Sequence, residues 1–387
     1  MPLSRSHKLA DHLADRLADR LANRVTAPLE AVTKLMRSER SLLSYVRARS
    51  ALYTAESLLG PAIELLVHRR KPRLPIDDMA LFTAARSDLE AIFRQDVKNI
   101  QDGVYPIEVL QPGSAIDHLK RLPLMFREGV DISRRRREHQ AHEFSEKAQS
   151  LMNDLPNYYR RNFHFQGDGY LSDRSAELYD HQVDVLFAGS TDAMRRMIIK
   201  PLREKFGTSD GEGLKFLEVG AGTGRATRFV RLAFPKAKIV AVDLSAPYLK
   251  KAQVELREFA RHDFIEADGA KLPFLDETFD AVYSVFLFHE LPQAERPLII
   301  REGLRVLKPG GFYGFVDSLQ LGDRPALDVA LKQFPIEFHE PFYKNYIRTP
   351  MREIFENEGL TNLEEATGFF SKMIAATKPA AAAAETH

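Results

Sequence analysis

The sequence contains no cysteine among its 387 residues, which excludes disulfides, thiolate zinc sites and a cysteine nucleophile. It has no apolar run near the about 18 residues that a membrane span needs, and its first residues lack the apolar core of a signal peptide. The 55 basic residues nearly balance the 54 acidic ones, so no overall field would gather nucleic acid or anionic membrane. We therefore expect a soluble, cytoplasmic protein with neither nucleic acid as a partner nor stable membrane insertion.

A glycine-rich turn is the most informative feature that is present. The apolar stretch 214–217 leads into Glu218-Val-Gly-Ala-Gly-Thr-Gly224, and a helical pattern follows at 225–234. This order predicts a strand, a tight turn and a helix, with glycines that let the backbone approach a ligand. The glycines alternate as G-x-G-x-G, whereas dinucleotide folds usually show G-x-G-x-x-G around a pyrophosphate. The acid would repel a pyrophosphate but can face the ammonium and sulfonium of S-adenosyl-L-methionine (SAM).

Further signatures follow this turn in order. A strand at 238–242 ends in Asp243, 19 residues beyond Gly224, where a carboxylate can accept hydrogen bonds from both hydroxyls of a ribose. A third strand at 262–266 precedes Ala267-Asp-Gly269, and a mostly apolar fourth strand at 279–288 runs into His289-Glu-Leu-Pro292. A helix at 294–307 then ends in Lys-Pro-Gly-Gly, which releases the chain into a fifth strand at 312–317.

In this run of motifs, about the second half of the chain resembles the class I SAM-dependent methyltransferases of the small-molecule type. The resemblance implies an α/β fold with a Rossmann-like seven-stranded sheet, mostly parallel with an antiparallel C-terminal strand, whose last two strands fall at 362–366 and 369–377. It implies SAM as the cofactor and S-adenosyl-L-homocysteine as its product, with Asp268 near the adenine amino group. The cofactor-binding residues would be Glu218, Gly220, Ala221, Gly222, Gly224, Asp243, Leu244, Asp268, Gly269 and Phe286.

The region before this domain has a different pattern. Residues 1–152 predict helix after helix, including one at 133–152, and form an all-α accessory or oligomerisation domain. A leucine repeat at 9–24 favours a partner helix within the chain or in a homodimer, while interleaved Asp residues weaken a membrane-surface alternative. Residues 153–207 form an aromatic-rich lid and a long helix at 175–202, residues 208–378 the methyltransferase domain, and residues 379–387 a disordered tail.

Two aromatic-rich segments, 156–172 and 338–348, combine rings with hydrogen-bonding side chains. This composition suits a surface that touches a ligand with flat apolar faces, although an aromatic wedge between the helical domain and the sheet is an equal alternative for the first segment. By the resemblance, the segment before the first strand would contact substrate. The candidate substrate pocket consists of Tyr158, Tyr159, Asn162, His164, Gln166, Tyr170, His339, Tyr343 and Tyr346.

Methyl transfer from an activated sulfonium depends largely on alignment in a dry pocket, and it needs a base only when the acceptor must lose a proton. His289 is our first candidate for a base or acceptor orienter because imidazole titrates near neutrality. Glu290 would hold His289 or bind a cationic acceptor. The alternative is that His289 only shapes the pocket and Glu290 caps the next helix.

The same motifs limit the acceptor. No Asp-Asp-Asn set of oxygen ligands is present, so we expect no metal. The fourth strand ends in His-Glu-Leu-Pro and not in the Asn/Asp-Pro-Pro-Tyr pattern of enzymes that methylate amino groups of proteins or nucleic acids. The sequence predicts a methyltransferase for a small-molecule acceptor. A membrane-associated lipid- or sterol-type methyltransferase and a non-catalytic SAM-binding assembly or regulatory protein are the alternatives.

Overall fold

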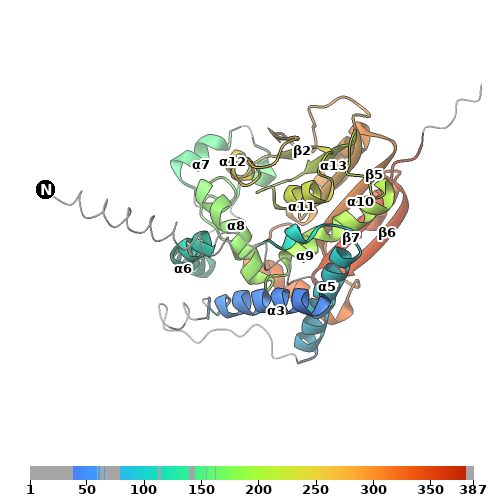
Figure 1. Cartoon of the computed structure of the whole chain (residues 1–387). Helices are drawn as coiled ribbons and strands as arrows, with labels where there is room; N and C mark the ends of the chain where they lie inside the picture. The colour runs from blue at the N-terminus through green and yellow to red at the C-terminus, as the bar shows by residue number, and fades with distance from the viewer. Residues whose placement is uncertain are drawn as a thin grey trace, which may run out of the picture.

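The computed structural model describes residues 38–58, 60–61, 65, 79–111, 115–138, 144–153, 155–161 and 163–380. Its centre is a seven-stranded sheet in the order β3-β2-β1-β4-β5-β7-β6 (Figure 1). The strands are β1 Lys215–Val219, β2 Lys238–Asp243, β3 His262–Glu266, β4 Phe279–Val285, β5 Leu307–Ser318, β6 Thr361–Gly368 and β7 Ser371–Thr377. Strand β7 runs opposite to the other six strands of this sheet, which confirms the expected fold class.

The strand order reverses between β1 and β4, because the chain first builds outward to β3 and then returns to the other side of β1. In open parallel sheets, such a reversal leaves a crevice at the carboxyl ends of the strands. The apolar residues of β1, β2 and β4 are buried on both faces, as a central parallel strand requires. The sequence pattern therefore places a ligand crevice at the tips of β1, β2 and β4.

Helices cover both faces of the sheet. Those of the second half are α8 Asp173–Leu186, α9 Thr191–Arg195, η3 Arg196–Ile198, α10 Ile199–Phe206, α11 Arg225–Ala233, α12 Ala246–Glu255, η4 Phe288–Glu290, α13 Glu295–Val306, η5 Pro325–Leu327, α14 Asp328–Phe338, α15 Tyr343–Tyr346 and α16 Met351–Asn357. Those before them are α3 Glu39–Glu56, α5 Met79–Gln101, η1 Ile107–Leu110, α6 Ala115–Glu138, α7 Glu146–Leu151 and η2 Asn157–Tyr159.

Helix α5 packs against β6 of the sheet, and α3 packs against α5 and α8 (Figure 1). Leu43 of α3 and Phe93 of α5 belong to the same buried cluster as Met194, Phe229 and Met373 of the second half. Burial of each such side chain is worth about 1.5–3 kcal/mol, so the first helices and the sheet stabilise each other. The leucine repeat at 9–24, on which the homodimer prediction rests, lies outside the described residues.

Two helix predictions were wrong. The stretch 175–202 is not one helix, because Ala188 and Gly189 adopt positive φ values of 50° and 72° after α8 and the chain restarts in α9. The N–H of Gly189 donates to the carbonyl of Asp184, a C-terminal helix stop that periodicity alone does not reveal. The stretch 133–152 likewise divides into the end of α6 and a separate α7 capped by Ser145.

A buried ion pair fastens α5 to the sheet layer. Asp96 accepts hydrogen bonds from Nε and Nη2 of Arg196 at 2.8 and 2.7 Å and from the hydroxyl of Tyr105 at 2.6 Å. We expect Asp96→Ala to lower the free energy of unfolding by about 3 kcal/mol, because it leaves the guanidinium buried without a counter-charge. Urea denaturation would measure this loss. Asp102→Ala, which removes an exposed partner of Lys98, is the control and should cost under about 1 kcal/mol.

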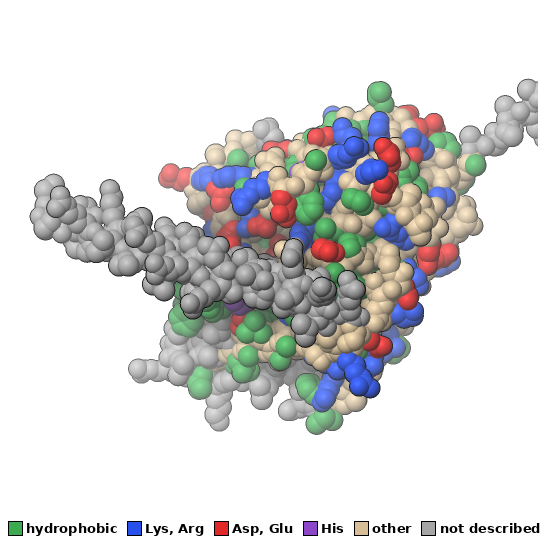
Figure 2. All heavy atoms as spheres, in the orientation of Figure 1, with side chains coloured by type: hydrophobic (Ala, Val, Ile, Leu, Met, Phe, Trp, Pro, Cys, Tyr) green, Lys and Arg blue, Asp and Glu red, His purple; other side chains and the backbone are tan. Residues whose placement is uncertain are grey.

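The surface agrees with the balanced composition. On the face in Figure 2, basic and acidic side chains are interspersed. Among the helices that the structure describes, none combines the length and apolar character needed to cross a membrane.

Candidate functional site

A cavity opens at the carboxyl ends of β1, β2 and β4, where the strand order reverses. Its empty space is about 980 Å³, including the part open to solvent. The lining residues come from the glycine turn, the strand tips, α8 and the aromatic segment before it. They include Tyr158, Tyr159, Phe163, Tyr170, Tyr179, Arg195, Glu218, Gly220, Ala221, Gly222, Thr223, Arg225, Asp243, Leu244, Tyr248, Gly269, Phe286, Leu287, Glu290 and Ile299.

The glycine turn forms one edge of the cavity. Gly220 has a φ of 75°, and a Cβ there would lie 2.9 Å from Leu287, so a larger residue would meet both strain and a clash. Gly222 has a φ of 53°, and an added Cβ would meet only a Tyr248 ring carbon, at 3.8 Å. The turn thus keeps its own backbone close to the cavity and leaves the space beside Gly222 open.

Asp243 ties the tip of β2 to this turn. One carboxylate oxygen accepts the N–H of Gly222 at 2.8 Å, and the other accepts the N–H of Ser245 at 2.8 Å. Burial raises the pKa of Asp243, and these backbone donors oppose the rise. The carboxylate lines the cavity, so it can hold the turn and still face a bound hydroxyl.

Glu218 lies on β1 beneath the turn and also lines the cavity. Its Oε2 accepts hydrogen bonds from the hydroxyls of Thr227 at 2.5 Å and Tyr283 at 3.0 Å. Burial raises the pKa of Glu218 to about 7 against these hydrogen bonds. A cation in the cavity would favour the ionised form of this carboxylate.

The other predicted cofactor residues divide into two groups. Ala221, Leu244, Gly269 and Phe286 line the cavity, whereas Gly224 and Asp268 do not belong to its lining. Gly224 caps α11 with a φ of 75°, and a Cβ there would lie 2.9 Å from Ala252 of α12. Asp268 accepts the N–H of Ala270 at 2.9 Å and so closes a turn after β3. Both residues shape the strand ends from outside the cavity.

Aromatic rings form the opposite wall. Tyr170 contacts four neighbouring tyrosine and phenylalanine rings: it stacks on Phe163 at a centroid distance of 5.0 Å and packs at 5.4–6.1 Å against Tyr248, Tyr179 and Tyr159. All five line the cavity. The segment before α8 therefore builds part of the cavity and also packs against the sheet layer through Tyr248 of α12.

A cluster of ionisable side chains borders this wall. We call His164, Tyr170, Glu290 and Glu340 the His–Glu cluster. The hydroxyl of Tyr170 donates to Oε1 of Glu290 at 2.6 Å, and Nε2 of His164 lies 2.9 Å from that hydroxyl. Nδ1 of His164 lies 2.7 Å from Oε1 of Glu340, as an ion pair without the alignment of a hydrogen bond. An imidazole thus lies between two carboxylates.

The charges in this cluster follow from that arrangement. Burial alone would lower the pKa of His164, but Glu340 and Glu290 outweigh it and raise the pKa to about 10. Burial would raise the pKa of Glu290, but the two nearby imidazoles lower it. Burial and Glu290 raise the pKa of Glu340. His164, Glu290 and Glu340 compete for one proton. We assign this proton to His164, because each of its ring nitrogens faces a carboxylate.

His289 lies in η4, the short helix that follows β4, next to Glu290. Its Nδ1 lies 2.5 Å from Oδ1 of Asp317, and its Nε2 lies 3.7 Å from Oε1 of Glu290. Asp317 is fully buried at the end of β5 and also accepts the N–H of Phe288 at 2.6 Å. Burial alone would lower the pKa of His289, but Asp317 outweighs it and raises the pKa to about 9. The sequence predicted titration near neutrality, but the carboxylate of Asp317 favours the protonated imidazole at neutral pH, which disfavours His289 as a base.

The remaining predicted pocket residues have other contacts. Gln166 is hydrogen-bonded to Ser175 and Gln182, and His339 packs on Phe165 at a centroid distance of 4.9 Å. Neither belongs to the cavity lining. The rings of Tyr343 and Tyr346 lie at steep angles to the His289 ring, at centroid distances of 6.0 and 6.2 Å. Asn162 lies outside the described residues.

Sequence reasoning missed several residues of the site. Asp317 was detectable, because it ends the predicted fifth strand as Asp243 ends the second. Glu340 follows His339 in a segment already singled out, but nothing local distinguishes it. Tyr179 and Arg195 lie on helices that the sequence assigned only to a connection. Arg195 pairs with Asp180, which accepts a hydrogen bond from Thr223 of the glycine turn at 2.8 Å.

The His–Glu cluster predicts how stability depends on pH. An imidazole whose pKa rises from about 6.5 in the unfolded chain to about 10 stabilises the fold fully below about pH 6.5. This contribution is lost as the pH rises toward 10. We expect the melting temperature of the protein to fall between pH 7 and 10, and that of His164→Gln to fall less. In His164→Gln, the remaining fall in melting temperature up to about pH 9 would come from His289. An equal fall in the natural protein and in His164→Gln would contradict the assignment of the proton to His164.

The comparisons concern the part of the chain that holds this cavity. Residues 216–311 match a methyltransferase-domain family. A fatty-acid O-methyltransferase of Mycolicibacterium smegmatis is 29% identical over 147 residues, which are 38% of this chain and 53% of that protein. A ubiquinone/menaquinone biosynthesis C-methyltransferase of Pseudomonas paraeruginosa is 34% identical over 140 residues, 35% of this chain and 52% of that protein.

This chain also matches a crystal structure of a SAM-dependent methyltransferase from Aquifex aeolicus, with 21% identity and a TM-score of 0.34. The match covers 46% of this chain and 88% of that protein chain. The chain spans about half the length of the two curated relatives. The family match includes the glycine turn, Asp243 and Glu290.

Proposed function

Because the chain belongs to the class I SAM-dependent methyltransferase family, we propose that it transfers a methyl group from SAM to a small organic acceptor bound in the cavity beside Glu290. The observation that carries the proposal is that the glycine turn, the Asp243 carboxylate and the Glu290 carboxylate line one cavity at the strand tips. A cofactor pocket and a group suited to an acceptor are thus open to the same space.

The cavity residues fit this cofactor. Gly222 leaves open space beside the turn, and Asp243 offers a carboxylate to ribose hydroxyls. Glu218 offers a second carboxylate to a positive group, while Leu244, Gly269 and Ile299 form an apolar patch of the lining. When bound, SAM supplies a methyl group on a positively charged sulfur. The protein has to bind, orient and shield the reacting groups.

The ring wall supports exclusion of water. Tyr158 and Tyr159 are half-buried at the cavity, and the rings of Phe163 and Tyr170 pack against Tyr159. Such a wall favours an acceptor with a flat or extended apolar body, because aromatic faces bury large area with little loss of side-chain freedom. Two of the relatives reported above are named for a fatty acid and for ubiquinone and menaquinone, which have apolar bodies of this general kind. Their names support the same class of acceptor here.

Glu290 is the group best placed to meet the acceptor's polar end. Its lowered pKa keeps it ionised at neutral pH, and its buried Oε2 has no hydrogen-bond partner among the described residues. A buried unpaired carboxylate oxygen is costly unless a donor satisfies it. We assign Oε2 to the hydrogen bond or proton of the acceptor's nucleophile, or to the charge of a cationic acceptor.

The other charged groups position Glu290. His164 and the Tyr170 hydroxyl fix Oε1 of Glu290, and His289 adds a positive charge behind it that Asp317 holds in place. With His289 protonated at neutral pH, we assign it to orienting Glu290, whereas the sequence predicted a base or an orienter of the acceptor.

The test is a titration of ligand-stripped protein with SAM and S-adenosyl-L-homocysteine, with NAD as a control, followed by an acceptor screen. Binding of the adenosyl ligands but not of NAD, and transfer of a labelled methyl group to a fatty acid, quinol or phenol of the screen, is the expected result. Binding without transfer to any acceptor class would favour the non-catalytic alternative. Absence of binding would overturn the proposal.

A further inference from the structure

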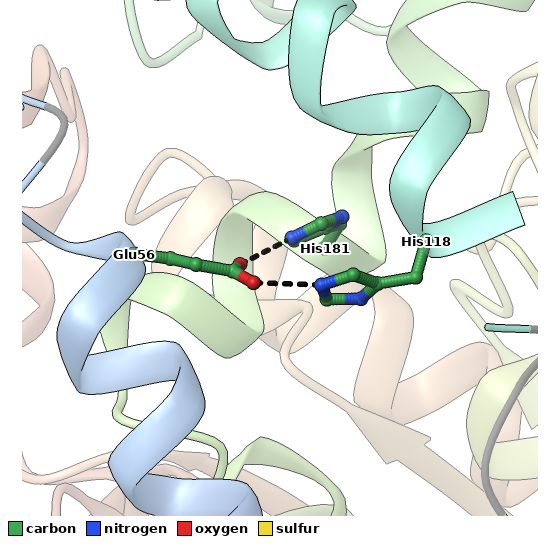
Figure 3. Close-up of side chains that lie close together, drawn as sticks. All are labelled: Glu56, His118 and His181. Carbon is green, nitrogen blue, oxygen red and sulfur yellow. Dashed lines mark hydrogen bonds and ion pairs between the residues drawn. The ribbon is translucent and has the colours of Figure 1, made fainter. Parts of the chain in front are cut away.

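A second group of ionisable side chains lies away from the cavity, where α3, α6 and α8 meet. Figure 3 shows Glu56 of α3 facing His118 of α6 and His181 of α8. Nε2 of His118 lies 2.6 Å from Oε1 of Glu56, and Nε2 of His181 lies 2.7 Å from Oε2. Two imidazole nitrogens and a carboxylate from three helices thus converge on one point.

The rings are held in this arrangement by packing. The His118 and His181 rings stack at a centroid distance of 4.4 Å with 26° between their planes. Tyr53, one turn before Glu56 on α3, sets its ring at a steep angle to both, at 5.9 and 5.8 Å. A fixed orientation lowers the cost of bringing the three groups together around a ligand.

The charge of this group is not balanced by a basic side chain. Among the described residues, Glu56 forms ion pairs only with these two imidazoles, although its side chain is only 10% exposed. Arg121, one turn after His118, is engaged by Glu177 at 2.9 Å. A mostly buried carboxylate whose described ion-pair partners are two imidazoles is a site that a cation would stabilise.

We propose that Glu56, His118 and His181 bind one divalent transition-metal ion, with zinc as the best match. Two imidazoles with one carboxylate suit Zn²⁺, Fe²⁺ or Ni²⁺, whereas Mg²⁺ and Ca²⁺ prefer oxygen ligands throughout. Three protein ligands leave a position for water. His118 is 20% exposed at the rim, which provides a path for entry.

The proposal departs from the sequence-based prediction of no metal. That prediction looked for clustered oxygen ligands, but His118 and His181 lie 62 and 125 positions from Glu56, on separate helices. Only their packing brings the ligand atoms together. The three ligand atoms lie within 4.8 Å of one another.

A metal here would fix one wall of the cavity. The neighbours of His181 on α8 are Tyr179, which lines the cavity two residues earlier, and Asp180, which is hydrogen-bonded to Thr223 of the glycine turn. An ion shared by α3, α6 and α8 would hold α8 against the first helices. Its role would be structural, because none of its ligands lines the cavity.

The test uses the full chain without a polyhistidine tag, stripped with a chelator and titrated with Zn²⁺ by calorimetry and with Co²⁺ by visible absorption. We expect one equivalent to bind and His118→Ala to weaken that equivalent more than about tenfold, since even an outer partner of a metal ligand is worth that much. His164→Ala is the matched control, because it removes a histidine from the other His–Glu group and should leave this equivalent in place.

A second variant separates metal binding from hydrogen bonding. His118→Gln keeps a donor for Glu56 but is a poor zinc ligand, and His118 is exposed enough for the fold to tolerate the change. We expect Zn²⁺ to raise the melting temperature of the natural protein and not that of His118→Gln. No bound equivalent, or an equivalent unaffected by His118→Ala, would show that the three side chains are only hydrogen-bonded.

Discussion

Glu290→Gln is expected to lower the turnover of methyl transfer by about 10²- to 10⁴-fold and to leave the affinity for SAM nearly unchanged. Glutamine can still accept the Tyr170 hydroxyl at Oε1, so the loop keeps its shape. It carries no charge, however, and its amide cannot take a proton from an acceptor at the position of Oε2. It also leaves two protonated imidazoles without the carboxylate between them.

Formation of S-adenosyl-L-homocysteine at saturating SAM, with an acceptor found in the screen, would measure the effect. The control is Glu353→Gln, because Glu353 is exposed on α16 and does not line the cavity. Equal melting temperatures of the natural protein and Glu290→Gln would exclude unfolding as the cause. If turnover stays normal, Glu290 does not contact the acceptor, and methyl transfer depends on alignment by the ring wall.

Asp243→Ala is expected to weaken the binding of SAM and of S-adenosyl-L-homocysteine by about 10²- to 10⁴-fold. The carboxylate would make two hydrogen bonds to ribose, each worth about 1.5–3 kcal/mol when one partner is charged, and every 1.4 kcal/mol is tenfold in affinity. Its loss also frees the N–H groups of Gly222 and Ser245, which loosens the glycine turn. Calorimetric titration would give the two dissociation constants.

Asp268→Ala is the matched control for this loss. The family resemblance assigned Asp268 to the adenine, but the structure places it outside the cavity lining, where it accepts the N–H of Ala270. We expect this variant to weaken SAM binding by no more than about tenfold, the value of one neutral hydrogen bond or less. If Asp268→Ala costs as much as Asp243→Ala, the adenine lies nearer β3 than the cavity lining indicates.

Short-range sequence patterns were sufficient to predict the central strands of the fold. The strands at 215–219 and 238–243 each combine a continuous apolar run with an acid at or near its tip, which is readable because both signals lie within a few residues. The glycine turn was readable for the same reason, since positive φ at Gly220 and Gly222 is a local demand. The break at Ala188 and Gly189 was missed, because an apolar stripe continued in α9 and hid a change of direction.

The sequence by itself predicted the family resemblance, the cavity edge and the two carboxylates, Asp243 and Glu290, on which the proposed binding and chemistry depend. Each of these features lies inside one contiguous motif, in which residues that are close along the chain are also close in the folded structure. The tertiary structure decided which groups set their charge: Asp317 behind His289, and Glu340 beside His164. It also brought Glu56 to His118 and His181. These contacts join residues far apart in the chain, so they depend on how helices pack onto the sheet, which no local pattern encodes.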